Sequence, residues 1–126
     1  MLESYTIGKE VEAKALQWFL ENRKCRLLIK NFRCRAGEID FIVEEKLPTQ
    51  IQTYELVFVE VRARAPGKSW FDPISSIGWK KKICLRKAAE VYLGKYKGRA
   101  TSARFDLLCW DTAQWEHRLN IQVGQD

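Results

Sequence analysis

The segment LVFVEVRA, residues 56–63, decides the fold. Its first four residues are all apolar, which is typical of a central strand that is covered on both faces. Its later part alternates between valines on one face and Phe58, Glu60 and Arg62 on the other. The sequence therefore predicts a central strand that carries an acid and an arginine toward its end.

Residues 38–44, EIDFIVE, alternate in the same way and predict a second strand. We expect Ile39 and Phe41 on one face and Asp40 on the other. The stretch between the two strands, EEKLPTQIQT at 44–53, holds a proline and several polar residues, which favour a loop. The two strands are therefore expected to pair as an antiparallel hairpin.

This hairpin would gather charged side chains at one end of the sheet. Pairing that is symmetric about Gln50 places Asp40 opposite Glu60 and Glu38 opposite Arg62, all on one face. A register shift of one residue would move one strand's set to the opposite face. Two facing acids repel each other unless a cation lies between them. The second pair has a simpler alternative, which is an ordinary and weakly stabilising cross-strand ion pair.

A helix is predicted over residues 7–22, where apolar side chains recur on one continuous arc. Glu12 falls inside this arc, whereas Glu10, Lys14 and Glu21 occupy the opposite face. Burial of a carboxylate is costly unless it has a partner or a cation. Three alternatives are therefore open for Glu12. It lies at the edge of the arc with its hydrogen bonds satisfied, it pairs with a buried arginine, or it is the third member of the acidic cluster.

The rest of the chain adds one helix and two strands to the prediction. Residues 23–37 are expected to form a basic connection, and residues 64–78, with two prolines and two glycines, an irregular loop. A lysine-rich helix is expected over 79–96, followed by strands over 103–110 and 115–123. The order α-β-β-α-β-β predicts an α/β fold in which helices flank a central mixed β-sheet.

Composition favours a small domain that meets nucleic acid. The chain has 126 residues, 46% of them hydrophobic, so we expect a single domain over residues 1–126. The net charge of +6 favours DNA or RNA as a partner, although a basic surface that binds nothing is the alternative. No stretch approaches the roughly 20 apolar residues of a membrane span, and the N-terminal residues show no signal-peptide pattern. We therefore expect a cytoplasmic protein without a membrane partner.

The residue types restrict any metal to oxygen ligands. The four cysteines form no CxxC pair and His117 is the only histidine, which argues against a zinc site, a disulfide framework and histidine-based catalysis. Mg²⁺, or Mn²⁺ in its place, suits Asp40 and Glu60, because Mg²⁺ prefers oxygen ligands and retains several waters. Arg62 follows Glu60 by two residues on the same strand face, where its charge would stabilise a phosphate.

The motif GEID at 37–40, followed by VFVEVRAR at 57–64, resembles the YraN-like family of uncharacterised bacterial proteins (UPF-type), within the PD-(D/E)xK nuclease superfamily. The resemblance spans most of the chain, and it includes Gly8 and Glu12 of the first helix, residues 31–35, residues 81–93 of the second helix and residues 104–106. It implies a restriction-endonuclease-like core that forms a single nuclease-like domain.

The same resemblance implies a role for each site residue. Glu12 would be the carboxylate of the helix, Asp40 and Glu60 would bind the metal, and the carbonyl of Val61 would be a further ligand. Arg62 stands where the motif has lysine. Because arginine stays protonated at physiological pH, it cannot act as a general base, although it can still hold a phosphate.

Basic runs flank the acidic end of the sheet, and three of their residues are the expected nucleic-acid contacts: Arg35, Arg64 and Lys81. Lys81 would also add an ammonium group to the site if the start of the second helix faces it. Trp70, Phe71 and Trp79 could stack on bases, although aromatic side chains are more often part of the core.

The expected function is that of an endonuclease-like, metal-dependent phosphodiesterase acting on nucleic acid, with Glu12, Asp40, Glu60 and Arg62 as its catalytic residues. Arg62 keeps an alternative open, which is a catalytically impaired nucleic-acid-binding module that retains the nuclease fold. A third possibility is an interaction subunit whose basic faces meet an acidic protein. The sequence leaves open whether the substrate is DNA or RNA, and what the oligomeric state is.

Overall fold

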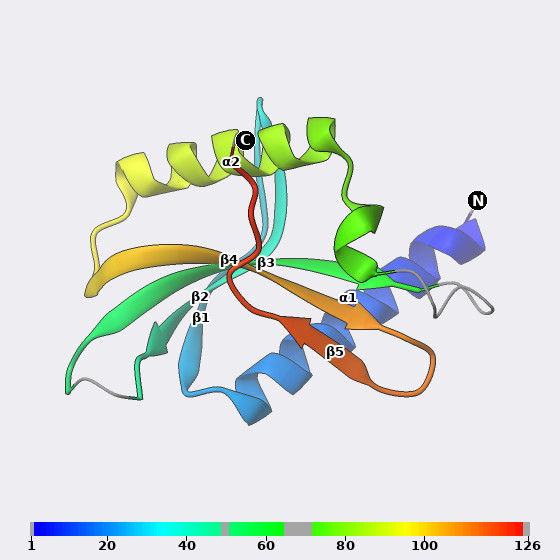
Figure 1. The fold of residues 1–126 in the computed structure, drawn as a ribbon, viewed down its shortest axis with the longest axis horizontal. Helices are drawn as coiled ribbons and strands as arrows, with labels where there is room; N and C mark the ends of the chain where they lie inside the picture. The colour runs from blue at the N-terminus through cyan, green and yellow to red at the C-terminus, as the bar shows by residue number, and fades with distance from the viewer. Residues whose placement is uncertain (1, 49–50, 65–71, 125–126) are drawn as a thin grey trace.

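Figure 1 shows the computed structural model, in which a β-sheet lies between two long helices. The structure describes residues 2–48, 51–64 and 72–124, and side chains from residue 8 onward. The elements in chain order are α1 (Leu2–Asn22), β1 (Cys25–Cys34), β2 (Gly37–Lys46), β3 (Tyr54–Ala63), the 3-10 helix η1 (Pro73–Ser76), α2 (Trp79–Lys95), β4 (Ala100–Trp110) and β5 (Trp115–Arg118).

The five strands lie in the order β1-β2-β3-β4-β5. β3 and β4 run parallel and the other neighbouring strands run antiparallel, so the sheet is mixed, as expected. β3 is the middle strand, which agrees with its apolar residues on both faces. α2 connects β3 to β4 and covers one face, while α1 covers the other (Figure 1). Neither of these helices, as far as the structure describes them, is long and apolar enough to cross a membrane.

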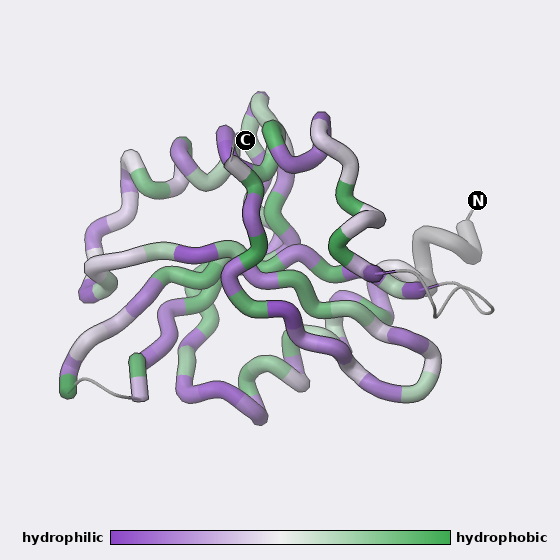
Figure 2. The backbone as a smooth tube through the Cα atoms, viewed as in Figure 1, coloured by the Kyte–Doolittle hydropathy of each residue, from purple (hydrophilic) through white to green (hydrophobic). Residues whose placement is uncertain are grey.

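Each face of the sheet has its own core. The α1-side core consists of Ala15, Phe19, Phe41, Val43, Val57, Val59 and Leu108. The α2-side core consists of Phe32, Ile39, Ile42, Leu56, Phe58, Ile77, Leu85, Ala88, Ala89, Leu107, Ile121 and Val123. Figure 2 shows apolar and polar segments alternating along α2 and along the coloured part of α1, as expected of helices that bury one face.

Residues 23–37 were predicted as a basic connection, which is wrong, because they contain the additional strand β1 before the two predicted strands. β1 is an edge strand, and its Arg26 and Lys30 are exposed. Charged residues are common on edge strands because they discourage pairing with other chains. A register shift between Leu27 and Ile29 interrupts the alternation further. The observed order is α-β-β-β-α-β-β.

The last strand is shorter than the predicted 115–123, because β5 ends at Arg118. The residues that follow form an irregular tail toward α2. Ile121 and Val123 hold this tail in place, since both are buried in the α2-side core and each is only 7% exposed. The other predicted elements differ from the observed ones at their ends.

The hairpin of β2 and β3 has the predicted register, because Ile42 pairs with Phe58. The ladder ends at Phe41 and Val59, one pair before Asp40 would meet its partner. Beyond this point the two strands are linked through a side chain instead of through backbone pairing.

The strict alternation predicted for β2 is wrong at this end of the strand. Ile39 packs in the α2-side core with Ile42, whereas Phe41 packs in the α1-side core. The change of face falls at Asp40, which lines a cavity against α1 instead of lying on the same face as Ile42. The carboxylate of Asp40 accepts a hydrogen bond from the backbone of Val61, which accounts for its departure from the ladder.

Candidate active site

Three acids from three elements meet at one end of the sheet: Glu12 of α1, Asp40 of β2 and Glu60 of β3. The N–H of Val61 donates a hydrogen bond of 2.7 Å to Asp40 Oδ2, which joins β2 to β3 where their ladder has ended. The side chains of Asp40 and Glu60 also lie close enough for each to shift the pKa of the other. The structure thus brings these two acids close together, although through the hydrogen bond from Val61 and not through the predicted pairing on one face of the sheet.

Glu60 is deeply buried, with only 4% of its surface exposed. Its Oε2 lies 3.3 Å from Arg62 Nη2 and 3.8 Å from Lys81 Nζ. Its Oε1 is also buried, and none of the described residues forms a hydrogen bond with it. A buried acceptor without a partner is costly, so Oε1 is an open position that a ligand could occupy.

Burial raises the pKa of both acids of this pair. Burial, followed by the negative charge of Asp40, raises the pKa of Glu60 to about 8, although Lys81 and Arg62 act in the opposite direction. Burial also raises the pKa of Asp40, against hydrogen bonds from Val61 and Glu60 that favour its ionised form. Two acids enclosed side by side have this effect because neither can easily carry its charge. The pair therefore retains a proton near neutral pH unless a cation replaces it.

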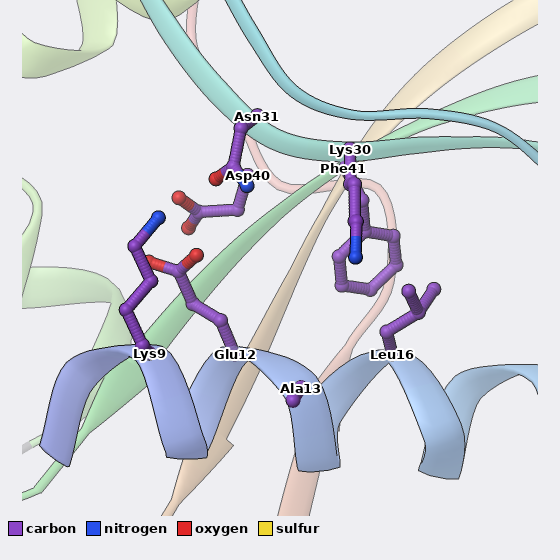
Figure 3. A pocket seen from close by; sticks show the side chains of 8 residues that line it. All are labelled: Lys9, Glu12, Ala13, Leu16, Lys30, Asn31, Asp40 and Phe41. Carbon is purple, nitrogen blue, oxygen red and sulfur yellow. The ribbon is translucent and has the colours of Figure 1, made fainter. Parts of the chain in front are cut away.

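Figure 3 shows the side of the site that faces α1. Glu12 and Lys9 extend from α1 toward Asp40, and Asn31 of β1 lies beside Asp40. These residues help to line a cavity of about 170 Å³. Burial, and then the charge of Asp40, raises the pKa of Glu12, whereas Lys9 lowers it. Glu12 is half-buried and close to Asp40, and its membership of a functional acidic cluster stays a prediction.

Arg62 and Lys81 bring two cations to Glu60 from different elements. Arg62 lies near the end of β3, and Lys81 lies in the first turn of α2. The start of α2 therefore faces the site, which is the condition stated for Lys81. The Nε of Arg62 is buried, and no acceptor among the described residues meets it. The guanidinium thus has a donor left over for a further acceptor such as a phosphate oxygen.

Gly37 allows α2 to approach β2 closely. A Cβ at this position would lie 3.0 Å from the Cβ of Cys84 and 3.1 Å from its carbonyl oxygen, which is closer than packed atoms normally approach. Gly37 is the glycine of the GEID motif that also contains Asp40. The motif therefore combines an acid of the site with close packing of the helix that carries Lys81.

Three further residues singled out in the sequence have other contacts or are exposed. Glu38 pairs with Arg33 of β1 and not across the hairpin, which corrects the predicted cross-strand pair. Arg35 is exposed in the turn between β1 and β2. Arg64 has a side chain that is 11% exposed and lies 3.0 Å from Glu116 of β5. Contact of Arg35 and Arg64 with nucleic acid stays a prediction.

Sequence reasoning missed a buried network of charges elsewhere on the sheet. Arg104 contacts Glu45 at 2.6 Å, Glu55 at 2.8 Å and Asp106 at 2.8 Å, and His117 Nε2 lies 2.7 Å from Asp106 Oδ2. Burial acts to raise the pKa of Asp106, but hydrogen bonds from His117 and Arg104 outweigh it and lower the pKa. The members satisfy one another, which indicates a structural role. One signal was present, since Asp106 stands among apolar residues in its strand.

The acids suit a hard divalent cation, although no described group of three His, Cys, Asp or Glu side chains is arranged to hold a metal ion. Mg²⁺ commonly takes one or two carboxylates and completes its octahedron with waters and substrate phosphate. Asp40 and Glu60 would supply the carboxylates, and the Val61 carbonyl stays a predicted further ligand. The buried Oε1 of Glu60, which lacks a partner among the described residues, fits this donor set.

Comparison with known proteins places the chain in a family. The model of the uncharacterised protein family UPF0102 matches residues 11–109, which include all three acids. A UPF0102 protein of Acinetobacter baylyi is 32% identical over 127 aligned residues, covering 99% of this chain and 81% of that protein. A UPF0102 protein of Janthinobacterium sp. (strain Marseille) is 37% identical over 104 residues, or 82% of this chain and 76% of that one. Another, from Persephonella marina, is 37% identical over 105 residues, which is 83% of each chain. The chain therefore belongs to the uncharacterised protein family UPF0102.

Proposed function

We propose that this protein is a Mg²⁺- or Mn²⁺-dependent phosphodiesterase that cleaves nucleic acid, with a restriction-endonuclease-like core of the PD-(D/E)xK type. One observation carries the proposal. Glu60 buries an oxygen without a partner among the described residues beside Asp40, while Arg62 and Lys81 supply positive charge to the same place. Acids that attract a divalent cation and cations that attract phosphate are the groups that phosphodiester hydrolysis requires.

Asp40 and Glu60 would hold the metal, with the carbonyl of Val61 as a further ligand. A divalent ion bound there would supply charge that polarises the phosphate and lowers the pKa of a water molecule. The hydrogen bond from the Val61 N–H fixes the orientation of Asp40, so the two carboxylates stay close despite their repulsion. The high proton affinity of the pair means that a cation must displace a proton on entering.

Arg62 and Lys81 would bind the scissile phosphate and stabilise the charge that develops on it. Arg62 cannot take up a proton, so it serves only as a charge and a hydrogen-bond donor. Glu12 faces Asp40 across the cavity and has a raised pKa, which suits a group that orients the attacking water and accepts its proton.

Cleavage of end-labelled single-stranded, duplex and branched DNA and RNA, with Mg²⁺ or Mn²⁺, tests this function. We expect the wild type to cut at least one of these substrates and Asp40→Asn to be slower by about 100-fold or more. Glu10→Gln is the matched control, because Glu10 is an exposed acid of α1, and it should leave the rate unchanged. Equal background for the wild type and Asp40→Asn would reject an enzyme.

A nucleic-acid-binding module that retains the fold is the second candidate, and the ion pair between Arg62 and Glu60 favours it. In such a module the arginine takes the place of a metal next to the acid. It predicts salt-sensitive binding that does not change on addition of EDTA. Arg62→Glu and Lys81→Glu should each weaken this binding, and binding that neither variant affects would reject the module.

A further inference from the structure

A groove lies between the start of α2 and the tail that follows β5, and its volume is about 420 Å³. Trp79, Lys82 and Arg86 line it from α2, and Gln122 and Val123 line it from the tail. Figure 1 shows the tail running up to α2. Because Val123 is also buried in the α2-side core, this wall of the groove is anchored to the body of the protein.

Trp79 exposes 68% of its surface, although an indole offers one of the largest apolar surfaces of any side chain. It has no part in either core. Lys80 Nζ lies 5.6 Å from the centre of its ring, which is a cation–π contact at an exposed site. Trp70 and Phe71, the other two aromatic residues considered for base stacking, lie outside the described residues.

The charges around the groove favour an anion. α2 carries six basic residues and one acid, Glu90. Lys82 and Arg86 lie one helical turn apart and both face the groove, and no acid is among the residues that line it within the described chain. Arg86 approaches Glu90 only at 4.0 Å, a surface contact of the kind that contributes little.

The groove adjoins the acidic cluster through the first turn of α2. Lys81 reaches Glu60, whereas its neighbour Lys82 lines the groove. Successive residues of a helix are rotated by about 100° about its axis, so a strand that reached both places would pass around the start of α2.

We propose that this groove binds an unpaired nucleotide, with its base stacked on Trp79 and its phosphates held by Lys82 and Arg86. Aromatic side chains bordered by cations are the features with which proteins hold single-stranded nucleic acid. Only an unpaired base exposes a face to the indole, so the substrate has a single-stranded segment next to the cleaved bond. The position of the cut rests on the proposed function, whereas binding in the groove does not.

Binding of labelled single-stranded oligonucleotides in EDTA at low salt, measured by fluorescence anisotropy, tests the groove. We expect Trp79→Ala to weaken binding about tenfold and Trp79→Phe to retain most of it, because one stacked base is lost in the first variant only. Lys82→Ala should weaken binding more than Lys87→Ala, which removes an exposed charge of α2 outside the groove. An abasic oligonucleotide should bind the wild type and Trp79→Ala equally.

Several results would contradict nucleotide binding in the groove. Two concern the variants: equal binding by Trp79→Ala and the wild type, or equal effects of Lys82→Ala and Lys87→Ala. The other two concern the wild type: no binding at low salt, or binding of a poly-glutamate peptide as strong as that of the oligonucleotide. Asp40→Asn should bind oligonucleotides as the wild type does. Binding that depends on Trp79, without any cleavage, would therefore reject the proposed enzyme and support the nucleotide-binding groove. Cleavage at the same rate by Trp79→Ala and the wild type would support the enzyme and reject the groove.

Discussion

Gly37 lies so close to Cys84 that a Cβ on residue 37 would come within 3.0 Å of the Cys84 Cβ. This contact sets the distance between β2 and α2. α2 in turn carries Lys81 to 3.8 Å from Glu60. Close packing at a glycine is therefore coupled to the charge that reaches the acids.

Gly37→Ala should lower the free energy of unfolding by about 1–3 kcal/mol, because the added methyl group must push α2 away from β2. Gly94→Ala, a glycine-to-alanine change within α2 itself, is the matched control. None of the described atoms lies within 4 Å of a Cβ there, and alanine favours a helix over glycine by about 0.5–1 kcal/mol, so this variant should gain stability. Urea unfolding measures both, and a Gly37→Ala variant as stable as the wild type would contradict the close contact.

In the absence of metal, the free energy of unfolding of the wild type should fall as the pH rises to about 8, and Glu60→Gln should not show this fall. The pKa of Glu60 is raised from 4.5 to about 8, so the folded protein keeps a proton that the unfolded chain has released. This contribution to stability is complete below pH 4.5 and is lost as the pH rises through about 8. Glutamine has no such proton to lose.

Urea unfolding in EDTA at about pH 5.5 and pH 8.5 measures this difference. Between these two pH values the wild type should lose at least about 1 kcal/mol more of its free energy of unfolding than Glu60→Gln loses. The same pH dependence in both proteins would show that Glu60 is not an enclosed acid.

Asp106→Asn should destabilise the protein by about 3 kcal/mol, because it leaves the buried charge of Arg104 less compensated and weakens the contact with His117. The lowered pKa of Asp106 contributes stability above its usual pKa, and this is lost as the pH falls through the folded value. Variant and wild type should therefore converge in acid. Asp111→Asn is the control, since asparagine can still accept the hydrogen bonds from the turn that follows, and a thermal scan showing similar shifts for both variants would count against the network.

The register of the hairpin that carries Asp40 and Glu60 could be predicted from apolar alternation, whereas the face on which Asp40 lies could not. In a hairpin, the buried residues determine the register, and Ile42 pairs with Phe58 as that pattern requires. Glu12 could be predicted for a related reason, since a carboxylate on the apolar arc of a helix needs a special environment. Both inferences, the hairpin register and the place of Glu12 on the apolar arc, rest on local periodicity alone.

Other features depend on contacts that local patterns do not contain. β1 was missed because an edge strand can carry charges such as Arg26 and Lys30, which hide its alternation. The change of face at Asp40 depends on a hydrogen bond from another strand. The contact between His117 and Asp106 joins two strands whose pairing no periodic pattern specifies.

Arg62→Met should lower the rate of cleavage by about 100-fold, because it removes a charge that stabilises the phosphate in the transition state. Arg62→Lys should retain most of the rate, since an ammonium keeps the charge although it loses bidentate geometry. Lys87→Met, an exposed charge of the same sign, is the control. Single-turnover kinetics compare the three variants, and wild-type cleavage by Arg62→Met would remove Arg62 from the mechanism.

Anomalous diffraction from crystals grown with Mn²⁺ tests the central claim most directly, because it locates a metal without requiring that the substrate be known. Mn²⁺ is a suitable probe since it accepts the oxygen ligands that Mg²⁺ prefers. We predict an anomalous peak between the carboxylates of Asp40 and Glu60, and no peak there in Asp40→Asn. Wild-type crystals saturated with Mn²⁺ that show no peak between these two acids would contradict it.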